Sequence, residues 1–508
     1  MKQLTPMDAQ FYYSDTTNQS MIIGGLHICD QSAAPNGFVR HKDILQYIED
    51  RLNTTSMYRR RLQKAPLSLD DPYWLDDENF DLEYHVRHVG LPQPGDWRQL
   101  CIFSSRIFAR TIDMERAPWE MYIIEGLDNV EGVPKGSFAV LTKMHHAYVD
   151  GQSGLSMLES LVEDSAAHEF GRRDNIQIVE HAPSATEMWM RTAPRLLGQT
   201  LRSAKGALDF AKSGLAFAQS MSNEENRTVL RTAPSTRFGV KVSPHRVYDA
   251  FFLDLSSLKA IKQSVAGATI NDTVISVLGG ALRRYMSAKH ELPDTSMISM
   301  CPVSGRPKDM KGEGGNDVSA MLVAVGTDIE DPIDRLTAVR EETLKGIALA
   351  KGPVSGLLNA LGEITPPIVR NLASQLQSKL PVVEGVANTV ITNVPGFVGG
   401  SAKYFAGAPI VQSTPYGPVA DGIGLFHAVS SYMGNVVIAV SADRAVMPDI
   451  DVYIQCIRDS FEEHIDAANA KVIADAEIAK AAAIEAEQAA AERKAAVAAK
   501  VKAQTSVV

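Results

Sequence analysis

Apolar residues along the chain recur with two spacings, and each spacing predicts one kind of element. Short continuous apolar runs predict buried strands, whereas apolar residues three or four positions apart predict helices that bury one face. Strands are predicted at 119–127, 137–146, 250–255, 297–303, 320–325, 386–393 and 436–441, and helices at 44–52 and 271–286. Because strands and helices alternate in both halves, the pattern predicts two α/β domains.

Changes in composition divide the chain into four parts. Residues 1–185 form an N-terminal domain, and residues 186–244 form a helical linker followed by a polar connector with Pro234 and Pro244. Residues 245–465 form the C-terminal domain. Residues 466–508 are rich in Ala, Lys and Glu, which favour helix. Because alanine supplies most of the apolar positions in this tail, we expect a solvated or loosely docked helix with a fraying end.

The linker stretch 186–222 mixes large apolar side chains with arginine and lysine, which predicts a basic amphipathic helix, broken near Pro194. Two interpretations remain open. The helix can be a crossover that packs on its own domain, or a surface that docks on anionic lipid. The apolar residues include Met188, Met190, Leu196, Leu197, Leu201, Leu208, Phe210, Leu215 and Phe217, and the basic ones are Arg191, Arg195, Arg202, Lys205 and Lys212.

Charge and cysteine content narrow the classes of function. The net charge of −10 argues against nucleic-acid binding, which needs a basic face. The four cysteines are widely spaced and form no CxxC pair, so we expect no metal site and a reducing, cytoplasmic environment. The first residues lack the apolar core of a signal peptide, and no apolar run has the length of a membrane span. Any lipid-handling role is therefore expected to be peripheral.

The segment 144–151, MHHAYVDG, holds the strongest chemical signal. The predicted strand before it ends in His145 and His146, and alternation along a strand would point the two rings to opposite faces. Imidazole titrates near neutral pH, so a histidine fixed at a strand end is suited to proton transfer. Asp150 and Gly151 give a turn signal, and the apolar spacing from Ser153 onward predicts a helix. A lone histidine at this position is more often structural, but the ordered HHxxxDG pattern favours catalysis.

Further segments extend this pattern along the chain, in order: LTPMDA at 4–9, 21–25, FDLEYHVR at 80–87, Asn271-Asp272, 302–316 and NVPG at 393–396. Together with HHxxxDG they resemble the bacterial bifunctional wax ester synthase/acyl-CoA:diacylglycerol acyltransferase family, within the chloramphenicol acetyltransferase-like superfamily. The resemblance runs to about residue 460. The segment 116–120, RAPWE, departs from the family's Pro-Leu-Trp motif, so Trp119 is interpreted as a core residue. Phe238-Gly239 replaces a Leu-Asn pair and receives no site role.

The resemblance implies two chloramphenicol acetyltransferase-like domains joined by a helical linker, with the active site in a channel at their interface. The implied reaction moves a long-chain acyl group from acyl-CoA to an alcohol, with acyl-CoA as a substrate and no cofactor. His146 is the implied general base and His145 a supporting residue. Asp150 either orients the imidazole or holds the loop through an arginine, and Gly151 permits a tight turn. Asn271 is implied to act from the second domain, although simple capping of its helix is an equal alternative on the sequence alone.

The implied partners are acyl-CoA, a long-chain alcohol, diacylglycerol and the surface of a membrane or lipid droplet. No acyl-enzyme is expected, since the chain contains no GxSxG nucleophile elbow. One alternative is a non-catalytic lipid-surface protein on the same scaffold. Another is a condensation-type acyltransferase with a different acceptor, such as an amine.

Overall fold

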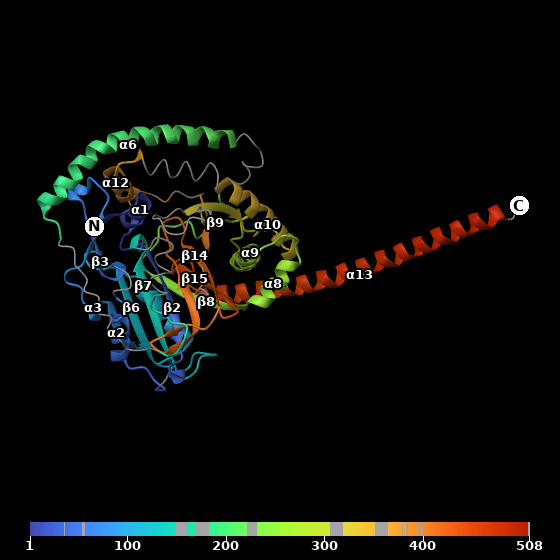
Figure 1. Cartoon of the computed structure of the whole chain (residues 1–508), viewed down its shortest axis with the longest axis horizontal. Coiled ribbons are helices and arrows are strands. Elements are labelled where there is room, and N and C mark those ends of the chain that lie inside the picture. The colour runs from blue at the N-terminus through green and yellow to red at the C-terminus, as the bar shows by residue number, and fades with distance from the viewer. Residues whose placement is uncertain are drawn as a thin grey trace.

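The computed structural model describes the whole chain except residues 35, 53–55, 149–159, 168–181, 221–230, 305–317, 351–363, 378, 381, 383–384, 395, 398–399 and 506–508. In this part of the chain the strands form two six-stranded sheets and a small three-stranded sheet. Helices flank the sheets, and two long helices, α6 and α13, extend along and away from the body (Figure 1). The predicted α/β class is confirmed.

The first sheet has the strand order β12-β13-β2-β7-β6-β5. Its strands pair antiparallel, except for the parallel pair β5 and β6. All eight residues of β7 are buried, as the continuous apolar run predicted. The strands are β2 (Ile22–Cys29), β5 (Val86–Gly90), β6 (Trp119–Glu125), β7 (Phe138–His145), β12 (Tyr404–Phe405) and β13 (Ala408–Tyr416).

The second sheet has the order β10-β9-β11-β14-β15-β8 and is mixed, because β11 pairs in parallel with β9 and β14. The strands are β8 (Arg246–Asp254), β9 (Ile298–Ser304), β10 (Val318–Ala324), β11 (Thr389–Asn393), β14 (Leu425–Tyr432) and β15 (Asn435–Asp443). The small sheet joins β1 (Lys2–Gln3), β4 (Tyr73–Asp76) and β3 (Arg60–Gln63) at the N-terminus.

The two halves of the chain interlock. Strands β12 and β13 fall within the stretch assigned by sequence to the C-terminal domain, yet they complete the first sheet. Thr414 of β13 pairs with Leu26 of β2. One hydrophobic cluster also contains residues of both sheets, including Leu141 of β7 and Tyr248 of β8. The halves are therefore held together by backbone pairing as well as by side-chain packing.

The helices begin where the sequence provides capping residues. Thr269 caps α9, and its hydroxyl accepts the Asp272 N–H while the Asp272 carboxylate accepts the Thr269 N–H, a capping box. Helix α9 is buried along most of its length and packs against α8, α10 and α13. The α-helices are α1 (Pro6–Ser14), α2 (His41–Glu49), α3 (Leu82–His85), α4 (Trp97–Phe108), α6 (Ala185–Ser220), α8 (Leu255–Gln263), α9 (Ile270–Ala288), α10 (Pro332–Leu349), α12 (Pro367–Gln377) and α13 (Ile450–Thr505). Short 3₁₀ turns include η3 (Pro66–Ser68) and η4 (His146–Tyr148).

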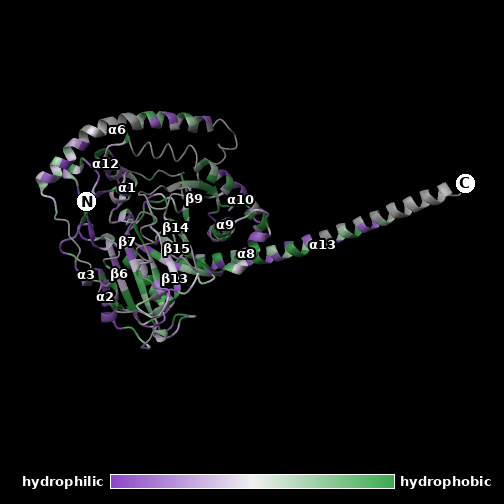
Figure 2. Ribbon diagram, viewed as in Figure 1, coloured by the Kyte–Doolittle hydropathy of each residue, from purple (hydrophilic) through white to green (hydrophobic). Residues whose placement is uncertain are grey.

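Helix α6 curves over one side of the body and carries both hydrophobic and hydrophilic residues along its length (Figures 1 and 2). It continues through Pro194, so the predicted break there is wrong. Proline removes one intrahelical hydrogen bond, but Pro194 and Met190 are exposed, so water can satisfy the carbonyl that loses its partner. Bending the helix at Pro194 therefore costs less free energy than ending it there.

Helix α13 has two parts with different surroundings. Its first turns pack into the core of the second domain through buried residues such as Tyr453 and Ile457. The rest projects away from the body (Figure 1), and Ile473 and Ile478 are exposed there. The predicted helical, solvated tail is confirmed. No helix in the described part of the chain has an apolar stretch of membrane-spanning length.

Candidate active site

The two histidines of the motif lie at the junction of a strand and a turn. Strand β7 ends at His145, and His146 begins the 3₁₀ turn η4. The prediction that alternation separates the rings assumed that both residues belong to the strand, and this assumption is wrong. The amide of His145 donates to the carbonyl of Pro118 at 3.0 Å, and the amide of His146 donates to the carbonyl of Met21 at 2.8 Å. The turn is therefore fixed to the segments that precede β6 and β2.

His146 has an apolar environment on one side. Its ring stacks on Phe11 of α1, with ring centroids 3.8 Å apart and an interplanar angle of 21°. The residue is partly exposed, but its Nδ1 atom is buried and makes no hydrogen bond with any residue that the structure describes. Burial lowers the pKa of His146 to about 4. The imidazole is therefore neutral at pH 7 and able to accept a proton.

His145 is fully buried and faces a carboxylate. Its Nδ1 atom accepts the amide hydrogen of Ala147 at 3.1 Å, so the ring proton must lie on Nε2. Nε2 lies 3.8 Å from Oδ2 of Asp15, too far for a direct hydrogen bond. Burial, and to a lesser extent the charge of His146, lowers the pKa of His145 to about 3. His145 is therefore neutral, and its N–H points toward Asp15.

Asp15 also connects to the turn through the backbone. Its Oδ1 atom accepts the amide hydrogen of Met21 at 2.8 Å, and the carbonyl of Met21 accepts the amide hydrogen of His146. Burial raises the pKa of Asp15 to about 6, against the opposing effects of the Met21 hydrogen bond and the charge of Lys143. Asp15 therefore lies beside the ring of His145 and is linked to the backbone of His146 only through Met21.

A second buried charge lies on the same strand. The ammonium of Lys143 is almost fully buried and lies 3.4 Å from Oε2 of Glu120 and 3.4 Å from the carbonyl of Thr111. Burial lowers the pKa of Lys143, while Glu120 opposes the shift. Residues 143 and 145 lie on one face of β7, because strand side chains repeat every two residues. Lys143 and Glu120 therefore form a buried ion pair near the histidine turn.

The other predicted site residues differ in what the structure says of them. Asn271 is the second residue of α9 and is half-buried, and no contact with His145 or His146 is found among the described residues. Its neighbour Asp272 is structural, because it caps α9 and accepts the hydroxyl of Thr343 at 2.7 Å. Asp150 and Gly151 lie outside the described residues.

Three further buried residues have structural contacts. Trp119 is a buried core residue at the start of β6, as expected, and its indole N–H donates to the carbonyl of Tyr58 at 2.8 Å. Nε2 of His427 meets the hydroxyl of Tyr453 at 2.8 Å. Asp443 pairs with Arg246 of the adjacent strand β8, at 3.6 Å.

Sequence reasoning missed Asp15 and Phe11 as neighbours of the histidines. Both lie next to the LTPMDA segment, which was read only for its family resemblance. The contacts follow from the pairing of β2 with β7, in which Ile22 lies opposite His145. A local pattern could not reveal this pairing. Among the described residues, no group of three or more histidine, cysteine or acidic side chains is arranged to bind a metal ion.

Comparison with known proteins shows the family of the chain. Residues 4–274 match the family model described as wax ester synthase/diacylglycerol acyltransferase catalytic domain, and residues 314–464 match the WS/DGAT C-terminal domain. A putative diacylglycerol O-acyltransferase of Mycobacterium tuberculosis is 30% identical over 484 residues, covering 88% of this chain and 94% of the relative. A second protein with that description in the same organism is 30% identical over 465 residues, covering 91% of this chain and 98% of the relative.

Solved structures share the fold. The wax ester synthase/diacylglycerol acyltransferase from Marinobacter aquaeolei superposes with a TM-score of 0.64 and 23% identity, covering 92% of this chain and all of that one. The starter condensation domain of rhizomide synthetase, in complex with C8-CoA, superposes with a TM-score of 0.54 and 13% identity, covering 92% and 95%. The family match therefore defines an acyltransferase, and the chain has the fold of the Marinobacter enzyme. The chain belongs to the wax ester synthase/diacylglycerol acyltransferase family.

Proposed function

We propose that this acyltransferase moves a long-chain acyl group from acyl-CoA to a hydroxyl, with a fatty alcohol and diacylglycerol as acceptors. The observation that carries the proposal is the neutral imidazole of His146, fixed at the end of β7 with a buried nitrogen that no described residue binds. The products are a wax ester or a triacylglycerol. The names of the two mycobacterial relatives support diacylglycerol as one acceptor.

His146 acts as general base in a ternary complex. The imidazole takes the proton of the acceptor hydroxyl as its oxygen attacks the thioester carbonyl, and a tetrahedral oxyanion forms. When the oxyanion collapses, the carbon–sulfur bond breaks and the CoA thiolate takes the proton from the imidazolium. Base and acid are then restored, and no covalent enzyme intermediate is needed. Asn271 serves as a donor to the oxyanion, as the family resemblance implies.

The surrounding residues position this base. His145 holds the turn through its Nδ1 atom, which accepts the Ala147 amide hydrogen, and Asp15 lies on the side of the ring where Nε2 carries the proton. Asp150 and Gly151 shape the loop that follows. Acyl-CoA is a substrate, and no cofactor is required. The acceptors are insoluble in water, so the enzyme works in the cytoplasm at the surface of a membrane or lipid droplet.

Release of CoA thiol tests the proposal. Purified protein is incubated with palmitoyl-CoA and either hexadecanol or dispersed diacylglycerol, and free thiol is followed together with the ester product. We expect thiol release that depends on the acceptor, and a loss of about 10²- to 10⁴-fold in His146→Ala. An exposed histidine far from the turn, changed in His290→Ala, is the control and should leave the rate unchanged.

Three results would contradict the proposal. Equal rates in His146→Ala and the parent would show that His146 is not the general base. Absence of thiol release with either acceptor would favour the non-catalytic lipid-surface protein, and release only with an amine acceptor would favour condensation chemistry.

A further inference from the structure

Helix α6 exposes a row of large apolar side chains. Met190, Leu208 and Leu215 are all exposed, with Leu208 at 61% and Leu215 at 62%. Spacings of 18 and 7 residues are close to five and two helical turns, so the three lie along one side of the helix. The buried residues Met188 and Thr192 lie on the other side, toward the body. The exposed row is therefore not the face by which α6 packs on the protein.

The apolar surface continues onto neighbouring elements. Turn η3 contacts both α6 and α12, and its Leu67 is 76% exposed. Helix α12 exposes Ile368, Val369, Leu372 and Leu376, while Arg370 and Ser374 are buried. Its exposed residues again fit one helical face, opposite the face that is anchored. We call the exposed apolar residues of α6, η3 and α12 the α6–α12 face.

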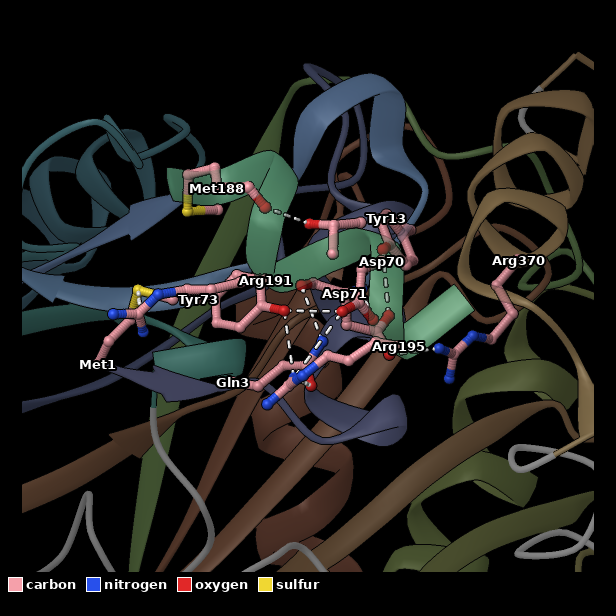
Figure 3. A network of polar contacts seen from close by, with 11 residues as sticks. Met1, Gln3, Tyr13, Asp70, Asp71, Tyr73, Met188, Arg191, Arg195 and Arg370 are labelled. Atoms are coloured by element: carbon pink, nitrogen blue, oxygen red, sulfur yellow. Dashed lines mark hydrogen bonds and ion pairs between the residues drawn. The ribbon is translucent and has the colours of Figure 1, made fainter. Parts of the chain in front are cut away.

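Two adjacent aspartates anchor these helices to the body (Figure 3). Asp70 accepts the hydroxyl of Tyr73 at 2.7 Å, and Arg195 of α6 reaches this pair, 3.1 Å from the Tyr73 oxygen. Asp71 pairs with Arg370 of α12 at 2.5 Å and accepts the hydroxyl of Tyr13 at 3.1 Å. Polar contacts thus hold the inner sides of both helices, which leaves their apolar sides facing outward.

The charge of α6 differs from that of the whole chain. The protein carries a net charge of −10, but α6 contains five basic and two acidic residues. Lys212 is exposed and lies between Leu208 and Leu215 along the helix. Basic residues beside an exposed apolar stripe are typical of helices that lie in the plane of an anionic bilayer surface.

We propose that the α6–α12 face docks on an anionic lipid surface, with the apolar row in the acyl-chain boundary and the exposed Lys212 at the head groups. This inference rests on the proposed function, because that function requires an enzyme with a water-insoluble acceptor to reach lipid. Isolated exposed apolar residues need no explanation, but several exposed apolar residues on elements that contact one another mark an interaction surface. The basic composition of α6 favours anionic lipid over a neutral apolar partner.

The face lies close to the catalytic turn. Helix α12 packs on α1, where Nε2 of Gln10 donates to Oγ of Ser374 at 3.1 Å. Helix α1 also packs on η4, where Phe11 stacks on His146. A single helix therefore connects the docked surface to the base.

Flotation with vesicles tests the docking. Full-length protein is mixed with vesicles of phosphatidylcholine alone, or of phosphatidylcholine with a minor fraction of phosphatidylglycerol, at low and high salt. We expect binding that requires phosphatidylglycerol and weakens at high salt. Leu208→Asp/Leu215→Asp should reduce binding at least about tenfold, because it places two charges in the inserted row. The matched control is Val472→Asp/Ile473→Asp, in the projecting part of α13, where both residues are comparably exposed.

Several outcomes would overturn the docking proposal: no binding, equal binding to neutral vesicles, or an equal effect of the two double variants. A dimer in sedimentation without lipid that Leu208→Asp/Leu215→Asp dissociates would assign the face to a second copy instead. Thiol release with a detergent-dispersed acceptor separates this proposal from the catalytic one. If the protein floats with vesicles but releases no thiol, the docking proposal stands and the catalytic proposal fails. If it releases thiol but does not float, the catalytic proposal stands and the docking proposal fails.

Discussion

Oδ2 of Asp15 lies 3.8 Å from Nε2 of His145, and the same carboxylate accepts the amide hydrogen of Met21, whose carbonyl binds the amide of His146. One buried carboxylate thus connects the two motif histidines. Its pKa is raised to about 6, whereas burial lowers the pKa of His146 to about 4. The two groups therefore titrate in separate pH ranges, which makes their contributions distinguishable.

The rate of acyl transfer should fall as the pH is lowered through about 6, because Asp15 becomes protonated there while His146 stays neutral. Asp15→Asn resembles the protonated state, so its rate should be roughly tenfold lower at neutral pH and flat down to about pH 5. Thiol release measured across this range checks both effects. A variant that keeps the wild-type acid limb would show that another group causes it.

Asp15→Asn should also stabilise the protein at pH 7. The folded pKa of Asp15 is above its unfolded value, so the folded state binds more protons between pH 4 and 6. The stability of the wild type therefore falls as the pH rises through this window and stays lower above it. Urea unfolding should show Asp15→Asn above the wild type at pH 7, with a difference that vanishes toward pH 4. Asp128→Asn, an exposed control, should show no such pH-dependent gain.

Phe11→Ala should raise the pKa of His146 from about 4 toward its ordinary value of 6.5, because water gains access to the ring that Phe11 now covers. Phe11→Leu keeps an apolar cover and should leave the pKa low. An NMR titration of the His146 ring protons gives both values. An unchanged pKa in Phe11→Ala would assign the shift to other neighbours.

The Asp71–Arg370 pair should stabilise the attachment of α12, since both side chains are 9% exposed. Arg370→Met leaves Asp71 buried without its cation and should cost about 3–5 kcal/mol of unfolding free energy. Asp71→Asn/Arg370→Met removes both charges and should recover most of this loss. A double-mutant cycle by urea unfolding measures the coupling, and simple additivity of the two changes would argue against it.

Gly24→Ala should destabilise the sheet next to the histidine turn. A Cβ atom at Gly24 would lie 1.9 Å from the carbonyl oxygen of Thr142 in β7, so the two strands would have to separate. We expect a loss of about 1–3 kcal/mol together with reduced activity. Gly90→Ala in β5 is the matched control, because nothing lies within 4 Å of the added atom.

Local pattern determined a large part of this protein. The continuous apolar run at 137–146 predicted β7, because a strand buried on both faces has apolar residues at successive positions. The apolar spacing at 271–286 predicted α9, because apolar residues three or four positions apart lie on one face of a helix. The ordered motifs indicated the family. Asn271 and Asp272 illustrate the limit of this reasoning, since capping and catalysis both favour the same residue types at a helix start, and the structure assigns only Asp272, as a cap.

Tertiary structure alone decided which distant segments meet. Strand β13 completes the first sheet through pairs such as Thr414 with Leu26, although the chain between them forms most of the second domain. The same kind of pairing places Asp15 beside His145 and lets Asp71 anchor α12 through Arg370. Backbone hydrogen bonds use the same N–H and C=O groups whatever the side chains are. The sequence of a strand therefore predicts that it will pair, but it does not predict which strand will be its partner. The sequence could propose His146 as a candidate base, whereas the residues that surround it depend on contacts that only the folded chain creates.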